Sequence, residues 1–243
     1  MSEPRSRTTT QPLAHQVRRA LWDKVPRDHR EAPAVLRRRQ WVVVGFVLAG
    51  AVTLGFGLRT APGSRAFYAL TLVVAGIWVV GAFASGPLHL GRIHWREDLR
   101  RPTFTPFVVG IAMVLLFVGG GFLVRSIPFL DPLTHQIQDV LGYTASSPLW
   151  ALALITAING AAEELFFRGA AYAAIPWHPV SWTTLAYVVA TLATGNVMLT
   201  FAAVLLGFVV GLERRASGGI QAPIITHLTW SLSMLVVLPW IFL

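Results

Sequence analysis

Two adjacent glutamates and an arginine interrupt a long apolar stretch of the sequence, at Glu163, Glu164 and Arg168. Glu164 and Arg168 are four residues apart, so on a helix they can form an ion pair along one face. Glu163 lies about 100° around that helix and is free to face another group. A pair made only to neutralise charge needs one glutamate, so the second carboxylate is a candidate general base that takes a proton from water.

The depth of Glu163 in its helix separates this catalytic interpretation from a structural one. If the helix ends at Gly169, both carboxylates lie within about two turns of water and share Arg168 at the membrane interface. If the helix continues to Pro176, Glu163 lies about 20 Å from its end. The uncharged run 169–175 favours the longer helix, and we therefore predict a carboxylate buried in the membrane.

His227 is a second polar residue inside an apolar stretch, and Ser231 follows it one helical turn later on the same face. A neutral imidazole can bind a metal, polarise a carbonyl or hold a water, whereas the alternative is a structural hydrogen bond to a neighbouring helix. Asn196 follows Gly195 at the predicted end of a helix, where both are common capping residues. Asn196 also lies about 22 Å along its helix, close to the depth of Glu163. It is therefore a candidate both for a helix cap and for a residue of the site.

The elements that position these residues are predicted to be transmembrane helices. The chain has 243 residues, of which 54% are hydrophobic and 13% charged, and the charges lie in short clusters between long apolar runs. A membrane span needs about 20 mostly apolar residues. The runs predict an all-α polytopic bundle of about seven to eight spans. Its spans are expected at 41–58, 66–84, 105–124, from 147 through the glutamate pair, 181–195, 197–212 and from 223 to the C-terminus.

The distribution of basic residues predicts the orientation of this bundle. Residues 1–40, 85–104 and 213–219, together with Arg168, hold 17 of the 20 Lys and Arg residues. The positive-inside rule then places these segments and the N-terminus in the cytoplasm. We expect residues 1–40 to be a separate basic segment, either a disordered tail or an amphipathic helix on an anionic leaflet, and residues 41–243 to be the membrane domain. Because the net charge of +9 is concentrated in this way, it does not indicate a nucleic-acid partner.

Missing residue types exclude several kinds of site. The chain has no cysteine, which excludes disulfides, thiolate metal sites and a cysteine nucleophile. It has no H-E-x-x-H motif and no aspartate within a predicted span, which argues against a zincin and a two-aspartate protease. His227 and Ser231 are unfavourably placed for a serine–histidine dyad, because neighbours one turn apart on one helix seldom align well. A carboxylate acting on water, a polarising histidine and an arginine remain, and this set suits hydrolysis of a peptide bond.

Two motifs in order are similar to those of a known protein family. The first is E-E-x-x-x-R at 163–168, and the second is the closing segment 206–227, which contains a G-x-x-x-G pair and ends in A-P-x-x-x-H. Together they resemble the CPBP family, which comprises the CAAX prenyl endoproteases of the Ras-converting type and their bacterial bacteriocin-processing or immunity relatives. The resemblance covers about 145–243 and implies an intramembrane endopeptidase.

The resemblance also implies roles for the matched residues. Glu163 would activate water, and Glu164 would assist it or pair with Arg168. His227 would bind the water or a metal, or polarise the scissile carbonyl.

Two positions differ from the family pattern. The family's F-x-x-x-H appears at 192–196 with Asn196 in place of the histidine, and its final H-x-x-x-N or H-x-x-x-D ends here in Ser231. Asn196 cannot act as a base, but it can orient water or donate to an oxyanion. A divalent metal such as zinc would have Glu163 and His227 as candidate ligands. Because Asn196 replaces a histidine of the family pattern, such a site would have one imidazole ligand fewer.

The expected substrate is a peptide or a lipidated protein that is cut near its C-terminus, and membrane lipids are the other expected partners. The resemblance suggests a bacterial plasma membrane. One alternative is a catalytically inactive relative that acts as a scaffold or immunity protein, in which residues 163–168 form a structural ion-pair network. A proton-coupled carrier that uses the same carboxylates is a third possibility, although the chain has no internal repeat typical of carriers.

Overall fold

Long α-helices make up most of the chain, as the apolar runs predicted. The structure is a computed structural model and describes residues 13–27, 31–57, 60–61, 63–95 and 98–243. Within these residues, six helices are long and apolar enough to cross a membrane. They are α2 (Pro33–Gly57), α3 (Arg65–Ser85), α4 (Phe104–Ser126), α6 with its continuation (Leu149–Ala174), α9 (Val197–Ser217) and α10 (Gln221–Phe242). With the shorter helix α8 (Pro179–Leu192) they form an all-α polytopic bundle, and this prediction is confirmed.

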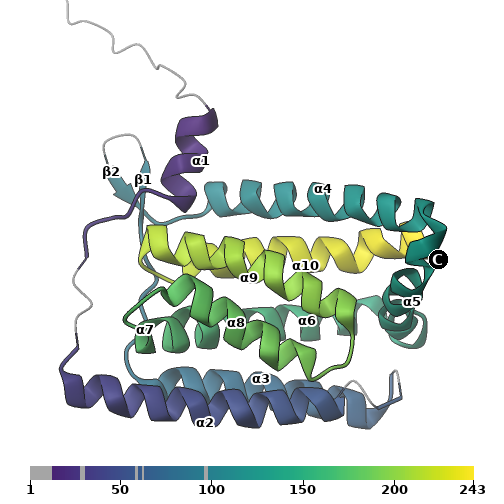
Figure 1. Cartoon of the computed structure of the whole chain (residues 1–243), viewed down its shortest axis with the longest axis horizontal. Helices are drawn as coiled ribbons and strands as arrows, with labels where there is room; N and C mark the ends of the chain where they lie inside the picture. Colours follow the sequence, from purple (N-terminus) through teal and green to yellow (C-terminus); the bar gives the residue numbers. More distant parts are fainter. Residues whose placement is uncertain (1–12, 28–30, 58–59, 62, 96–97) are drawn as a thin grey trace, which may run out of the picture.

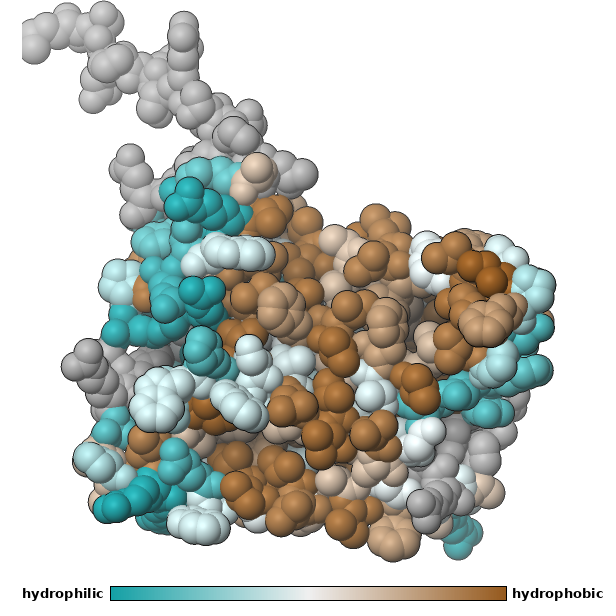
Figure 2. All heavy atoms as spheres, in the orientation of Figure 1, coloured by the Kyte–Doolittle hydropathy of each residue, from teal (hydrophilic) through white to brown (hydrophobic). Residues whose placement is uncertain are grey.

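The long helices run side by side, and their connections gather at two ends of the bundle (Figure 1). One end carries helix α1 (Leu13–Leu21), the two-stranded hairpin β1 (Ile93–Trp95) and β2 (Asp98–Arg100), and the turn between α9 and α10. The basic segments predicted to share one side of the membrane therefore do lie at one end. Apolar side chains cover the middle of the face in Figure 2 and polar side chains collect at its ends, as a membrane protein requires.

The N-terminal segment is fastened to this basic end. Helix α1 lies crosswise to the long helices (Figure 1). Beyond it, the backbone N–H of Val25 donates to the carbonyl of Ala216 at 3.1 Å, and the guanidinium of Arg27 donates to the carbonyl of Arg215 at 2.6 Å. Residues 1–12 of the predicted basic segment lie outside the described residues.

Two elements differ from their predicted extents. Helix α2 begins at Pro33 rather than Trp41, because a helix that leaves the membrane can continue through polar residues such as Arg37. Helix α5 (Asp131–Ser146) was not predicted, since its mixture of polar and apolar residues does not resemble a span. It lies at the end of the bundle opposite α1 (Figure 1).

The helices around the functional residues meet in a core of aromatic side chains. Trp78 of α3 is about 1% exposed, and its ring centre lies 4.8 Å from that of Phe166 and 5.0 Å from that of Phe167. Gly50 of α2 leaves the space for it, because a Cβ there would lie 2.0 Å from the Trp78 ring. This packing holds the helix that carries the glutamate pair against α2 and α3.

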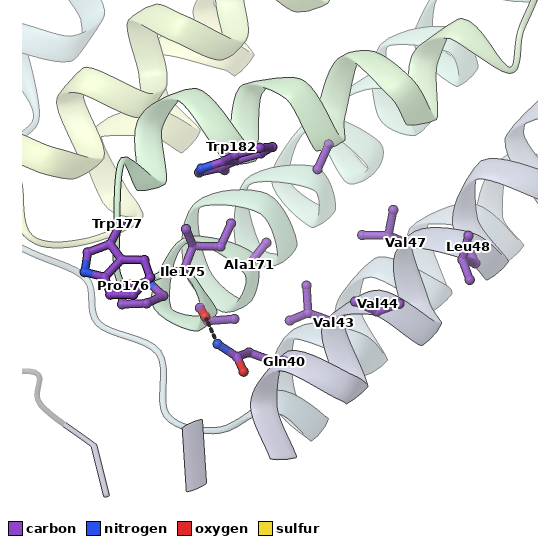
Figure 3. A pocket seen from close by; sticks show the side chains of 12 residues that line it. Gln40, Val43, Val44, Val47, Leu48, Ala171, Ile175, Pro176, Trp177 and Trp182 are labelled. Carbon is purple, nitrogen blue, oxygen red and sulfur yellow. Dashed lines mark hydrogen bonds between the residues drawn. The ribbon is translucent and has the colours of Figure 1, made fainter. Parts of the chain in front are cut away.

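An apolar groove of about 440 Å³ opens between α2, α8 and the end of the α6 continuation (Figure 3). Its walls are mostly aliphatic and tryptophan side chains, including Val43, Ile175 and Trp182. At one edge the side-chain amide of Gln40 donates to the carbonyl of Ala174 at 3.0 Å. The groove is distinct from the polar network described next, whose residues do not line it.

Candidate active site

The glutamate pair lies where helix α6 (Leu149–Glu164) changes its hydrogen-bond pattern. The chain continues without a break as the π-helix η2 (Leu165–Ala171) and then as the short α7 (Tyr172–Ala174). The longer of the two predicted helices is therefore correct, and Glu163 lies about 16 Å from its end. A π-turn is wider than an α-turn and is frequent at functional sites.

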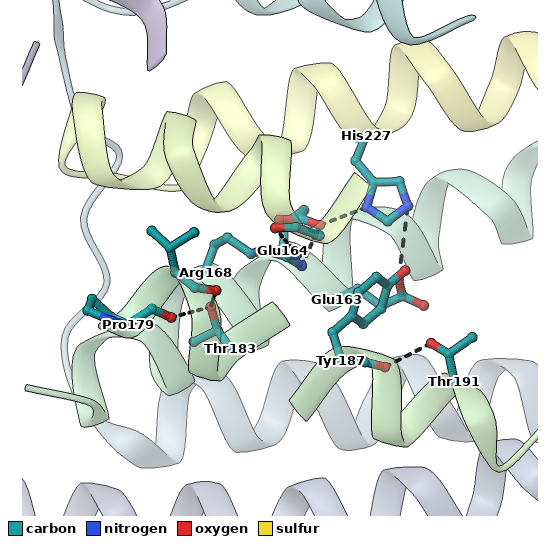
Figure 4. Close-up of polar contacts among 10 residues, drawn as sticks. Glu163, Glu164, Arg168, Pro179, Thr183, Tyr187, Thr191 and His227 are labelled. Atoms are coloured by element: carbon teal, nitrogen blue, oxygen red, sulfur yellow. Dashed lines mark hydrogen bonds and ion pairs between the residues drawn. The ribbon is translucent and has the colours of Figure 1, made fainter. Parts of the chain in front are cut away.

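Glu164 is the centre of the polar network. Its Oε1 accepts a hydrogen bond from Arg168 Nη1 at 3.0 Å and lies 2.8 Å from His227 Nδ1 (Figure 4). The side chains of Glu164 and Arg168 are fully buried, and that of His227 is nearly so. An ionised carboxylate can only accept, so the hydrogen between these two atoms belongs to His227 Nδ1.

Arg168 connects the π-helix to two further helices. Its Nη2 donates to the carbonyl of Gly207 on α9 at 3.0 Å, and its guanidinium carbon lies 5.0 Å from the ring centre of Tyr187 on α8. The carbonyl of Arg168 itself accepts from Arg214 Nε at 2.6 Å. A buried cation with this many partners holds the Glu164 carboxylate in one place.

Glu163 faces away from this ion pair, as its position on the helix predicted. The Tyr187 hydroxyl donates to its Oε2 at 2.6 Å, and the same oxygen lies 4.0 Å from His227 Nε2 (Figure 4). The Glu163 side chain is 18% exposed, whereas those of Glu164 and Arg168 are fully buried. A water about 2.8 Å from each of the two atoms could hydrogen-bond to both.

Four of the six predicted site residues thus meet in one network: Glu163, Glu164, Arg168 and His227. Ser231, one turn after His227, is partly buried, and its buried Oγ has no hydrogen-bond partner in the described part of the chain.

Asn196 is the sixth predicted residue, and its hydrogen bonds are those of a helix cap. Its Oδ1 accepts from the backbone N–H of Leu199 at 2.9 Å, and its Nδ2 donates to the carbonyl of Gln136 on α5 at 3.0 Å. It caps the start of α9, whereas the sequence suggested the end of the preceding helix. A helix start leaves N–H groups to be satisfied, which an amide oxygen does well.

Two members of the network were not predicted. Tyr187 is one of several hydroxyl side chains on α8, and its distance in sequence from Glu163 carries no information about contact. Gly207 contributes its backbone carbonyl, which every residue type has. The G-x-x-x-G pair in the sequence was the available signal, since a Cβ at Gly207 would lie 3.2 Å from Arg168 Nη2.

The side chains of this site differ from the set of ligands that catalytic zinc requires. Catalytic zinc has three protein ligands, and no group of three His, Asp or Glu side chains suited to a metal occurs among the described residues. Glu163 Oε2 and His227 Nε2 are 4.0 Å apart, wider than the spacing of about 3.4 Å that tetrahedral zinc would impose. This arrangement does not fit a zinc ion.

Comparison with known proteins identifies the part of the chain that carries this network. Residues 145–233 match the family model described as Rce1-like, type II CAAX prenyl endopeptidase. No curated protein and no solved structure matches the chain. The matched segment includes the E-E-x-x-x-R motif and His227, so the resemblance predicted from the two motifs is confirmed. Over residues 145–233, this membrane protein is therefore similar to the Rce1-like type II CAAX prenyl endopeptidases.

Proposed function

We propose that the protein is an intramembrane endopeptidase that hydrolyses a peptide bond near the C-terminus of a membrane-associated or lipidated substrate. The observation that supports this most directly is the position of Glu163 Oε2, 4.0 Å from His227 Nε2, on a side chain that is 18% exposed. The ion pair of Arg168 is complete with Glu164 alone. Glu163 is therefore an additional carboxylate that charge neutralisation does not require.

Water is activated between Glu163 and His227. The water donates one hydrogen to Glu163 Oε2 and the other to His227 Nε2, which directs its lone pair at the scissile carbonyl. As the C–O bond forms, Glu163 takes the first proton. It then passes that proton to the amide nitrogen as the C–N bond breaks. The second hydrogen of the water remains on the new carboxyl group, so the products are a carboxylic acid and an amine. That acid proton then moves to the amine, which leaves a carboxylate and an ammonium group.

The surrounding residues keep the reacting groups in position. The Glu164 carboxylate accepts a hydrogen bond from His227 Nδ1, and Arg168 donates to the same carboxylate and fixes its position. Tyr187 donates to Glu163 and orients its carboxylate. Preorganised groups of this kind lower the barrier because they do not have to rearrange during the reaction.

Asn196 and Ser231 have supporting roles in this proposal. Asn196 fixes the turn between α8 and α9 through its cap, and so places Tyr187 and Gly207 indirectly. Ser231 offers a buried hydroxyl one turn from His227 that is not used by another group within the described residues. The basic end of the bundle is the cytoplasmic end.

Comparison of protein C-termini in membranes containing either the wild-type protein or Glu163→Gln tests this function. We expect C-terminally shortened products with the wild-type protein and none with the variant, because glutamine cannot accept the proton. Equal membrane levels and melting temperatures of the two proteins are the necessary control.

Other outcomes would support the alternative functions. Identical C-termini in the two membranes would contradict a peptidase and favour an inactive scaffold or immunity protein. Substrate-driven proton flux in liposomes, abolished by the same substitution, would favour a carrier.

A further inference from the structure

Glu213 is a buried carboxyl group that the proposed mechanism does not use. It lies near the end of α9, is about 1% exposed and is absent from the ion pairs found among the described residues. The neighbouring Arg214 is directed elsewhere, with its Nε on the carbonyl of Arg168 and its guanidinium over the ring of Tyr172. An ionised carboxylate at this position would be buried without a cation, which is costly in a protein interior.

The hydrogen bonds of Thr226 indicate that Glu213 carries a proton. Thr226 Oγ1 lies 2.9 Å from the carbonyl oxygen of Pro106 and 2.9 Å from Glu213 Oε1. A hydroxyl has one hydrogen, and a carbonyl can only accept. When Thr226 donates to Pro106, the hydrogen between Thr226 and Glu213 must come from Glu213. Both hydrogen bonds are complete when Glu213 is a carboxylic acid.

Glu164 provides a second, independent reason. It interacts electrostatically with Glu213. The Glu164 carboxylate is itself ionised in this network, because it pairs with Arg168 and accepts from His227. Two nearby carboxylates in a low-dielectric site rarely ionise together. The Oε2 atoms of Glu164 and Glu213 are both buried, and neither has a hydrogen-bond partner within the described residues.

We infer that Glu213 is held as a neutral carboxylic acid and acts as a positioning residue for His227. It donates to Thr226, which donates to Pro106 on α4, and this chain of hydrogen bonds fixes α10 one residue before His227. With Glu213 neutral, the carboxylate that contacts His227 Nδ1 within the described residues is that of Glu164. The protonation of Glu213 is independent of the enzyme activity, whereas its positioning role rests on the proposed function.

Infrared spectroscopy of the full-length protein in lipid nanodiscs tests the protonation without any substrate. The C=O stretch of a protonated carboxylic acid is separate from the carboxylate bands. We expect the wild-type protein at neutral pH to show such a band and Glu213→Gln to lose it. Glu31→Gln is the matched control, because Glu31 has a cationic partner, Arg39, at 2.6 Å. A protonated-acid band unchanged in Glu213→Gln would overturn the inference.

The positioning role is tested by comparing two substitutions at the same residue. Glu213→Gln keeps a neutral donor to Thr226 and should retain activity within about threefold of wild type, whereas Glu213→Ala should lose about tenfold or more. If Glu213→Gln folds but is as inactive as Glu213→Ala, a charged Glu213 is required and the inference is wrong. If the wild-type protein cleaves nothing, the proposed function fails, and the infrared result still decides the protonation.

Discussion

Arg168 joins three helices through one guanidinium group. It donates to Glu164 on its own helix and to the carbonyl of Gly207 on α9, and it lies against the ring of Tyr187 on α8. Each contact uses a different part of the planar group, so a lysine could not replace it.

Replacing Arg168 with alanine should lower the free energy of unfolding by about 3–5 kcal/mol, because Glu164 is then buried without its cation. Denaturation in detergent micelles would measure this loss. Arg100→Ala is the control, because the Arg100–Asp98 pair is largely exposed and should contribute less than about 1 kcal/mol. Equal stability of the two variants would show that the Arg168 pair is dispensable.

Tyr187→Phe should preserve the fold and reduce cleavage. The substitution removes the hydroxyl that donates to Glu163 and keeps the ring beneath Arg168. The loss of one hydrogen bond to a charged group corresponds to a decrease of about 10- to 100-fold in kcat. Tyr172→Phe is the matched control, because Tyr172 contacts Arg214 through its ring face. A Tyr187→Phe enzyme with wild-type kcat would argue against a catalytic Glu163.

At the scale of the elements, the start of α9 depends on its cap. Asn196→Ala should cost about 1 kcal/mol of stability, and Asn196→Asp should cost less because it keeps an acceptor for the Leu199 N–H. Melting temperatures and cleavage rates of both variants would distinguish a cap from a catalytic group. A catalytic Asn196 would lose activity in Asn196→Asp without losing stability.

Helix α2 approaches α3 closely only at certain positions. A Cβ at Gly50 would overlap the Trp78 ring, whereas nothing lies within 4 Å of a Cβ at Gly45. Gly50→Ala should therefore lower the melting temperature, and Gly45→Ala should leave it unchanged or raise it slightly. Similar melting of the two variants would contradict this packing of Trp78.

At the scale of the whole molecule, the basic segments at one end of the bundle predict its orientation. The natural chain has no cysteine, so a single introduced cysteine reports its own location. Ala61 is exposed in the α2–α3 connection, and Arg100 is exposed in the hairpin at the opposite, basic end. A membrane-impermeant maleimide should label Ala61→Cys in intact cells and Arg100→Cys only after the membrane is opened. The reverse pattern would invert the topology.

The sequence determined the fold class and most of the polar network. Apolar length alone predicts membrane helices, because the bilayer core excludes unsatisfied backbone groups. The spacing of Glu164 and Arg168 predicted their ion pair, because both lie on one helix with a fixed repeat. The separate direction of Glu163 followed from the same geometry. Two ordered motifs were enough to indicate the family.

Only the tertiary structure decided which residues from different helices meet. Contacts such as Tyr187 with Glu163 or Thr226 with Glu213 depend on how the helices are rotated and offset against one another. The apolar pattern of a membrane helix does not specify that rotation, since lipid-facing and core-facing side chains are equally apolar. The π-helix at 165–171 places the Arg168 carbonyl on Arg214 of α9, and Asn196 adds to its local cap a hydrogen bond to the Gln136 carbonyl of α5. Both are contacts between elements that the sequence pattern does not specify.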